Sequence, residues 1–237
     1  VCRSQGLFYI FDKYRGSNMK TAILIDGAFF IKRVRSLGLS QNPHDAKRIA
    51  DLAFRYSMLH LKDKINGTDQ MGDLYRIFFY DCVPFEKKMH NPVSHRAIDF
   101  SKTPEAIFRR NLHTELKKKR KLALRLGKLS DNTAWILKPQ VMKNLLKNPS
   151  TQITENDVVL DVKQKGVDMR IGLDISSITL KKQADKIILF SGDSDFVPAA
   201  KLARREGIDF ILDPMWNHVP PDLMEHIDGL KTKCPKP

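Results

Sequence analysis

Residues 185–196 read Asp185-Lys186-Ile187-Ile188-Leu189-Phe190-Ser191-Gly192-Asp193-Ser194-Asp195-Phe196. The apolar run at 187–190 is typical of a buried strand that stops at Gly192, and a helical pattern then extends to Gly207. Two carboxylates therefore stand where the strand passes into the helix. In a parallel sheet this position lies in the crevice at the C-terminal ends of the strands, where open α/β sheets bind ligands. The stretch predicts an α/β domain with an acidic site.

Other strands are expected on both sides of this one. Residues 21–25 form a continuous apolar run that ends at Asp26-Gly27, residues 74–82 end near Asp81, and residues 208–212 end at Asp213. Helical patterns alternate with these strands at residues 28–37, 43–59, 104–116, 166–182 and 221–230, and Asn42 is the expected N-cap of the second helix. The alternation predicts a three-layer α/β/α (Rossmann-like) domain with a central, mainly parallel sheet.

The 237 residues are enough for one domain that carries an insertion. We expect residues 1–18 to be an N-terminal extension, because Met19-Lys20 followed by a strand is typical of a start. Residues 19–237 then form a single domain with a basic insertion around 83–165. Inside this insertion, residues 135–138 and 158–163 are expected to pair as a small β element around a helix at 139–147.

The charge balance favours an anionic partner. The chain has 41 Lys and Arg against 27 Asp and Glu, a formal charge of +14, and residues 1–18 account for only +2 of it. Nucleic acid is the first choice and an anionic membrane surface the second. The run Lys117-Lys118-Lys119-Arg120-Lys121 either contacts RNA or is a solvated cap at a helix C-terminus, and both readings stay open.

The sequence also indicates the compartment of the protein and the state of its cysteines. No run of about 18 apolar residues and no secretory leader is recognisable, so a cytoplasmic, non-membrane protein is expected. The three scattered cysteines argue against a disulfide framework and against a zinc site. His90 and His95 are interpreted as solvated loop residues. A homodimer is one of the states that the sequence leaves open.

The carboxylates can be interpreted as one group. Since parallel strands end at the same edge of a sheet, Asp26, Asp193 and Asp195 are expected to converge there. Asp168 and Asp174 fall on either edge of the apolar stripe of the helix before Asp193, roughly 60° from its centre, and Asp174 is the further candidate. Converging acids repel one another unless a cation neutralises them, and Mg²⁺ or Mn²⁺ is the cation that prefers carboxylate oxygens. Such a metal supports phosphodiester cleavage.

Three blocks of residues resemble a known family. Ile25-Asp26-Gly27-Ala28, Lys165-Gly166-Val167-Asp168 with Asp174, and Ser191-Gly192-Asp193-Ser194-Asp195-Phe196-Val197-Pro198 look like the signature blocks of the NYN domain, the LabA-like branch of the PIN-like nuclease superfamily. The resemblance spans about residues 20–230. Many relatives carry Asn three residues after the first Asp, where this chain has Phe29.

The resemblance implies a PIN-like α/β/α fold and metal-dependent ribonuclease chemistry. It implies Asp26, Asp174, Asp193 and Asp195 as catalytic residues, and the same four with Asp168 as ligands of Mg²⁺ or Mn²⁺. Ser191 is expected to shape the loop and, with Lys165 and residues 117–121, to contact the substrate.

Three functions were weighed. The leading hypothesis is an endoribonuclease that cleaves single-stranded RNA at a Mg²⁺ or Mn²⁺ site. The alternative is a catalytically silent NYN-type protein that binds nucleic acid or regulates a partner. A phosphatase that works through an aspartyl phosphate is disfavoured, because Asp26 is followed two residues later by Ala28 rather than by a second acid.

Overall fold

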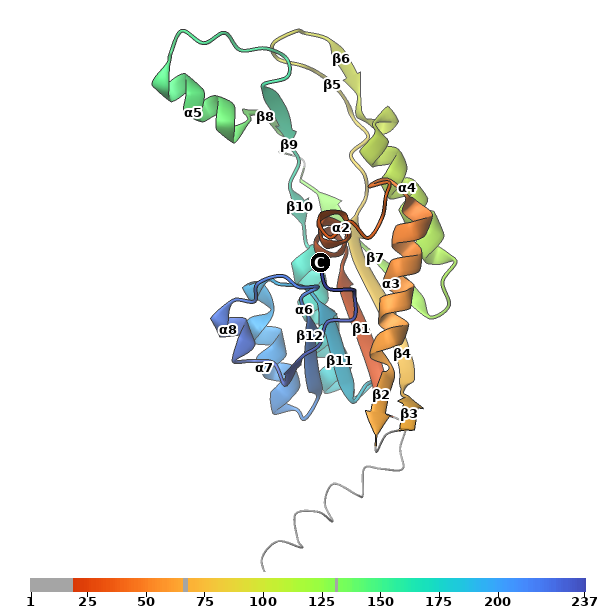
Figure 1. Cartoon of the computed structure of the whole chain (residues 1–237). Coiled ribbons are helices and arrows are strands. Elements are labelled where there is room, and N and C mark those ends of the chain that lie inside the picture. The colour runs from red at the N-terminus through yellow and green to blue at the C-terminus, as the bar shows by residue number, and fades with distance from the viewer. Residues whose placement is uncertain (1–18, 66–67, 131) are drawn as a thin grey trace, which may run out of the picture.

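The computed structural model of the chain describes residues 19–65, 68–130 and 132–237, so the extension expected over residues 1–18 lies outside the described part. A central sheet lies between two layers of helices, and an arm extends beyond one end of the sheet (Figure 1). The described helices include none that is both long and apolar enough to cross a membrane.

The central sheet has seven strands in the order β10-β7-β4-β1-β11-β12-β13. In chain order they are β1 (Lys20–Asp26), β4 (Asp73–Cys82), β7 (Leu122–Leu129), β10 (Gln164–Lys165), β11 (Lys186–Phe190), β12 (Asp209–Asp213) and β13 (Gly229–Leu230). All neighbouring strands are parallel except β10 and β7, which are antiparallel. The predicted three-layer fold with a mainly parallel sheet is confirmed.

Each face of the sheet has its own set of helices. The first set is α2 (Gly27–Ser36), α3 (Ala46–His60) and α4 (Pro104–Lys117), and the second is α6 (Val167–Leu180), α7 (Val197–Arg205) and α8 (Pro221–Met224). Alternate residues of β1 face the two sets: Ile23 and Ile25 pack with α2, α3 and α4, whereas Ala22 and Leu24 pack with α6 and α7. The strands are thus buried on both sides, as their continuous apolar runs predict.

The turn from β1 into α2 brings two backbones into close contact. A Cβ atom on Gly27 would lie 2.3 Å from the carbonyl oxygen of Tyr80 and 2.6 Å from the ring of Phe79. Because no side chain fits there, glycine allows α2 to begin directly after Asp26. The next helix starts later than predicted: its N-cap is Asp45, whose carboxylate accepts from the Arg48 N–H, while Asn42 forms the turn before it.

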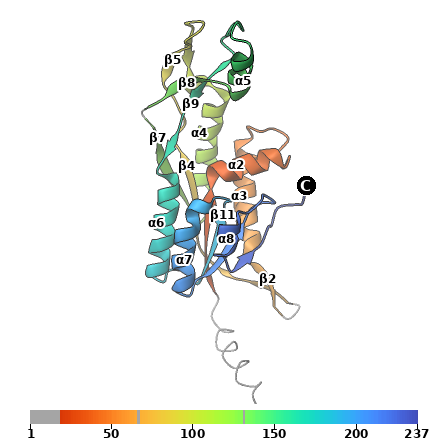
Figure 2. The same ribbon diagram turned by 90° about the vertical axis from the view of Figure 1, so that its left-hand side faces the viewer.

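The arm is made from two separate segments of residues 83–165, because α4 and β7 in the middle of that range belong to the main layers. The first segment contains β5 (Lys88–His90) and β6 (Ala97–Asp99). The second contains β8 (Ala134–Leu137), α5 (Pro139–Lys147) and β9 (Val158–Asp161). β8 and β9 pair as predicted, and Figure 2 shows the two segments side by side above the sheet.

Short elements in three regions of the chain differ from the sequence prediction. The last helix is only α8, and β13 occupies residues 229–230, where a helix was expected. An unpredicted hairpin, β2 (Lys62–Ile65) with β3 (Thr68–Met71), follows α3. Helix α7 is preceded by a single 3-10 turn at Ser194–Phe196.

Candidate functional site

The direction of each side chain sorts the carboxylates at the strand ends between the two faces of the sheet. Asp26 follows the side of Ala22 and Leu24, toward α6. Asp81 and Asp213 take the opposite parity and lie on the side of α3 and α4, where both are fully buried. Only some of the strand-end acids can therefore share one site.

Asp26 is the most perturbed acid of this edge. It is also the N-cap of α2, where its Oδ1 accepts from the N–H of Phe29 at 3.1 Å. Burial is the largest cause that raises its pKa, and the nearby charges of Asp168 and Asp193 raise it further, to about 6 from an ordinary value of 3.8. A neighbouring cation would stabilise the ionised form of this carboxylate.

The loop after β11 presents the next two acids. The buried Ser191 hydroxyl accepts from the N–H of Asp193 at 3.2 Å, and the Asp193 carboxylate accepts from the N–H of Asp195 at 3.0 Å. Ser191 thus helps to hold the shape of this loop. Asp193 and Asp195 are both exposed. An open pocket joins Asp193 to Asp26, Phe29 and Ser191.

Asp168 brings a fourth acid to this edge from the first turn of α6. Partial burial raises its pKa, and so do the charges of Asp193 and Asp195. Asp168 and Asp195 both line a second open pocket, between α6 and the start of α7. The structure therefore brings together Asp26, Asp168, Asp193 and Asp195, which we name the acidic edge.

The acidic edge has the donor chemistry of a site for a hard divalent cation. In the described part of the chain, none of its four carboxylates forms an ion pair with a lysine, arginine or histidine. No three His, Cys, Asp or Glu side chains among the described residues are close enough together to hold a metal as they stand. Mg²⁺, however, keeps several waters and needs only one or two direct carboxylates, so the set fits this ion.

Asp174 lies elsewhere on α6. Its Oδ2 accepts from the Tyr80 hydroxyl at 2.8 Å and lies 3.3 Å from Nε of Arg125 on β7. Burial and the Asp174 charge together raise the pKa of Tyr80, which keeps this phenol protonated as a donor. The structure thus pairs Asp174 with a cation, in contrast to the four acids of the acidic edge.

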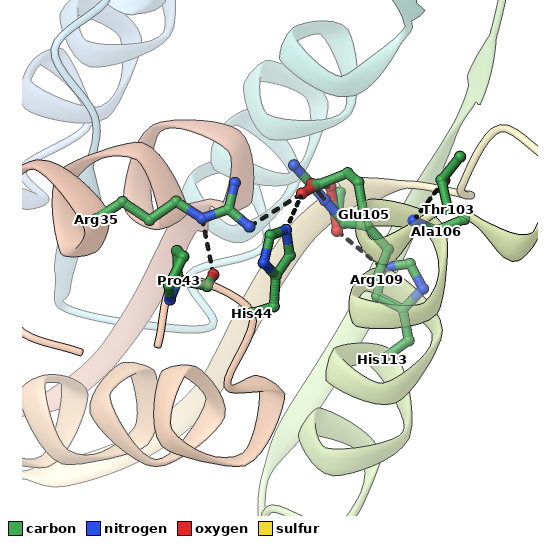
Figure 3. Close-up of polar contacts among 9 residues, drawn as sticks. Arg35, Pro43, His44, Thr103, Glu105, Ala106, Arg109 and His113 are labelled. Carbon is green, nitrogen blue, oxygen red and sulfur yellow. Dashed lines mark hydrogen bonds and ion pairs between the residues drawn. The ribbon is translucent and has the colours of Figure 1, made fainter. Parts of the chain in front are cut away.

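The carboxylates of the other two strand-end acids are bonded inside the protein. Asp81 is paired with Arg109 and with His113, whose Nε2 lies 2.8 Å from Oδ2 of Asp81. Arg109 also contacts Glu105, on which Arg35 and His44 converge as well (Figure 3). Asp213 bonds His60 at 2.7 Å. These acids hold helices to the sheet and are not available to a ligand.

The predicted basic residues lie at two different edges of the sheet. Leu122 pairs in register with Ile77, and Ile77 with Ile23, so the run Lys117 to Lys121 precedes the N-terminal end of β7. Lys119 pairs with Asp51, and Lys121 donates to the carbonyl of Leu74. The structure does not bring this run to the acidic edge. Lys165, in contrast, lies two residues before the start of α6 and is exposed.

Asn217 is a further residue of this site. This residue follows β12 and lines the same pocket as Asp26, Asp193 and Phe29. A Cβ atom on Gly192 would lie 3.1 Å from the amide nitrogen of Asn217 and 3.2 Å from the Phe29 ring, so the two side chains flank the same glycine. A carboxamide is thus present at the site although residue 29 is Phe. No local sequence pattern marks Asn217.

The raised pKa of Asp26 predicts a dependence of stability on pH. Between pH 3.8 and about 6 the folded protein holds a proton that the unfolded chain has released, so this contribution is full below that window and is lost as the pH rises through it. Asp26→Asn keeps an N-cap oxygen. We expect the metal-free variant to be more stable than wild type at neutral pH, by about 1–2 kcal/mol.

Thermal unfolding in the presence of a chelator measures this difference at neutral pH and again near pH 4. The difference should shrink at the acid end, because Asp26 is then protonated in the folded protein and about half protonated in the unfolded chain. If the wild-type protein is as stable as Asp26→Asn at neutral pH, or more stable, the result contradicts a raised pKa for Asp26.

The three layers and the acidic edge define a PIN-like α/β/α domain. The family model described as the NYN domain matches residues 20–227, and the chain belongs to this family, a branch of the PIN-like nuclease superfamily.

No curated protein matches the chain. Among solved structures, a similar chain is the crystal structure of a protein of unknown function, VPA0982, from Vibrio parahaemolyticus RIMD 2210633. It is 17% identical over 92% of this chain and 94% of that chain, with a TM-score of 0.48.

Proposed function

We propose that this protein is an endoribonuclease that cleaves single-stranded RNA with the help of Mg²⁺ or Mn²⁺ held at the acidic edge. One observation carries the proposal: in an NYN domain, four carboxylates lie together at the C-terminal edge of the sheet, and in the described structure none has a cationic side chain as partner. Uncompensated acids in such a crevice cost stability, which is typical of a functional site.

Each residue has a part in this reaction. Asp26 and Asp193 would hold the metal from the ends of two neighbouring strands, and Asp168 and Asp195 would accept hydrogen bonds from its bound waters. A divalent ion in this place would lower the pKa of a water and stabilise the oxygens that attack and leave. The Asn217 amide donates one hydrogen to the carbonyl of His218 at 3.3 Å, which leaves the second for a phosphate or a water in the same pocket.

Asp174 has a positioning role in this proposal rather than a catalytic one. Its bonds to Tyr80 and Arg125 tie α6 to β4 and β7. They thereby fix the helix whose first turn carries Asp168.

A catalytically silent NYN protein that binds RNA or regulates a partner is the second candidate. Two observations favour it. Phe29 stands where many relatives have Asn, and no three of the described acids are close enough together to bind one ion directly.

The direct test incubates the purified protein with a single-stranded RNA that carries different labels at its two ends. We expect internal cuts with Mg²⁺ or Mn²⁺, which yield fragments labelled at only one end, and we expect EDTA to stop them. RNA that stays intact with either metal contradicts the enzyme. Binding that weakens steeply with salt but leaves the RNA uncut would support the second candidate.

A further inference from the structure

A third pocket lies close to the acidic edge and is made by the base of the arm. It lies between the loop at residues 83–87, the C-terminal end of β7 and Arg170 on α6, and its volume is about 490 Å³. This volume is in the range of binding pockets of about 300–1,000 Å³. We name it the basic groove, because of the charges described next.

The basic groove collects cations for which the described residues offer no carboxylate partner. Lys87, Lys128 and Arg170 are exposed, and in the described structure none of them bonds a carboxylate. Glu86 is the one carboxylate among the described lining residues, and Arg110 already bonds it at 2.6 Å. Lys165 pairs in register with Lys128 between β10 and β7, which adds another exposed cation beside the groove. The groove is thus a site of uncompensated positive charge.

The first turn of α6 separates the groove from the acids. Val167 and Ile171 point into the core, and at about 100° per residue Asp168 and Arg170 fall on opposite flanks of that buried line. Asp168 lines the pocket beside Asp195, whereas Arg170 lines the basic groove. The two sites therefore lie about one helix diameter apart, roughly 10–12 Å.

We infer that the basic groove binds the phosphate backbone of a single-stranded RNA as it leads to the acidic edge. The cations attract phosphates and release their counterions, while the negative acidic edge accepts a phosphate only together with a metal. Contacts of this kind fix the position of the strand without reading its bases. The inference rests on the proposed function for the fate of the RNA, but binding to the groove can be measured apart from cleavage.

The experiment compares two variants with equal loss of charge in an Asp193→Asn background, which prevents cleavage during the measurement. The groove variant carries Lys87→Ala, Lys128→Ala and Arg170→Ala. The control variant carries Lys117→Ala, Lys118→Ala and Arg120→Ala at the opposite edge of the sheet. All six side chains are exposed, so both variants should fold, which circular dichroism verifies. Fluorescence anisotropy with a labelled single-stranded RNA then gives the affinity over a series of salt concentrations.

We expect the groove variant to lose about tenfold or more in affinity, and its dependence of log K on log salt to flatten by about 2 for three lost contacts. The control should change much less. Arg170→Gln alone should flatten the dependence by about 0.7, which keeps the test decisive if the triple variant does not fold.

Equal losses in the two variants, or no loss in the groove variant, overturn the inference, even if the wild-type protein cleaves RNA. Conversely, if the protein never cleaves RNA but the groove variant specifically loses RNA binding, this result overturns the proposed function and supports the groove as an RNA-binding site.

Discussion

Asp193→Asn is expected to lower the rate of metal-dependent RNA cleavage by about 10²–10³-fold, the usual cost of removing one preorganised electrostatic group from an active site. The variant loses the charge that would hold the metal. It keeps a side-chain oxygen that can accept from the N–H of Asp195, so the loop after β11 should keep its shape. RNA affinity should change little, because the cations of the basic groove are untouched.

Cleavage rates at saturating RNA, together with anisotropy for binding, separate these effects. Glu206→Gln is the matched control: it removes an exposed carboxylate that follows α7, at the other end of the sheet, and the rate should stay close to that of wild type. Cleavage by Asp193→Asn at the wild-type rate would show that the acidic edge is not the catalytic site.

Asp81→Asn is expected to destabilise the fold by about 3 kcal/mol or more, because removing one partner of a buried ion pair leaves the other charge uncompensated. The Asp81 side chain is fully buried, and its two oxygens bond Arg109 and His113. An amide cannot neutralise Arg109, which is only 16% exposed. Glu105 alone would then remain as the partner of that guanidinium.

Urea denaturation gives the free energy of unfolding. Asp51→Asn is the comparison, since Asp51 also pairs with a lysine of the α4–β7 region but is 45% exposed, and its loss should cost less than about 1 kcal/mol. If the two variants were equally stable, the buried pair at Asp81 would not be the link between α4 and the sheet that the structure indicates.

The sequence was sufficient to predict the main layers and the principal acids. Continuous apolar runs that end shortly before Asp26 and Asp193 are typical of strands buried on both faces, and parallel strands bring their ends to one edge. The alternation of side chains along each strand separates Asp26 from Asp81 and Asp213 only once the register between the strands and the helices on each face are known. The sequence does not supply this knowledge.

The sequence likewise does not decide which of Asp168 and Asp174 lies at the acidic edge. Both lie at the edge of the apolar stripe of α6, on opposite sides, and the pattern does not say which side faces α7 and which faces β7. The fold decides it: Asp168 meets Asp193 and Asp195, while Asp174 meets Tyr80 and Arg125. Tertiary packing, and not local sequence, therefore assigns the two roles.

Contacts between distant parts of the chain also decide where other residues lie. The lysine run stands out by its charge density, but the edge of the sheet at which it lies depends on the direction of β7. Lys87, Lys128 and Arg170 are far apart in the sequence and meet only at the base of the arm. Asn217 likewise joins Phe29 only in the folded chain. No local period marks such residues.

Isothermal titration calorimetry with Mn²⁺ tests the central claim most directly, because it asks whether the acidic edge holds a metal. We predict that the wild-type protein binds Mn²⁺ and that Asp26→Asn and Asp193→Asn each abolish or strongly weaken this binding, while Glu206→Gln retains it. Absence of binding in the wild-type protein, or unchanged binding in both acidic-edge variants, would contradict the account.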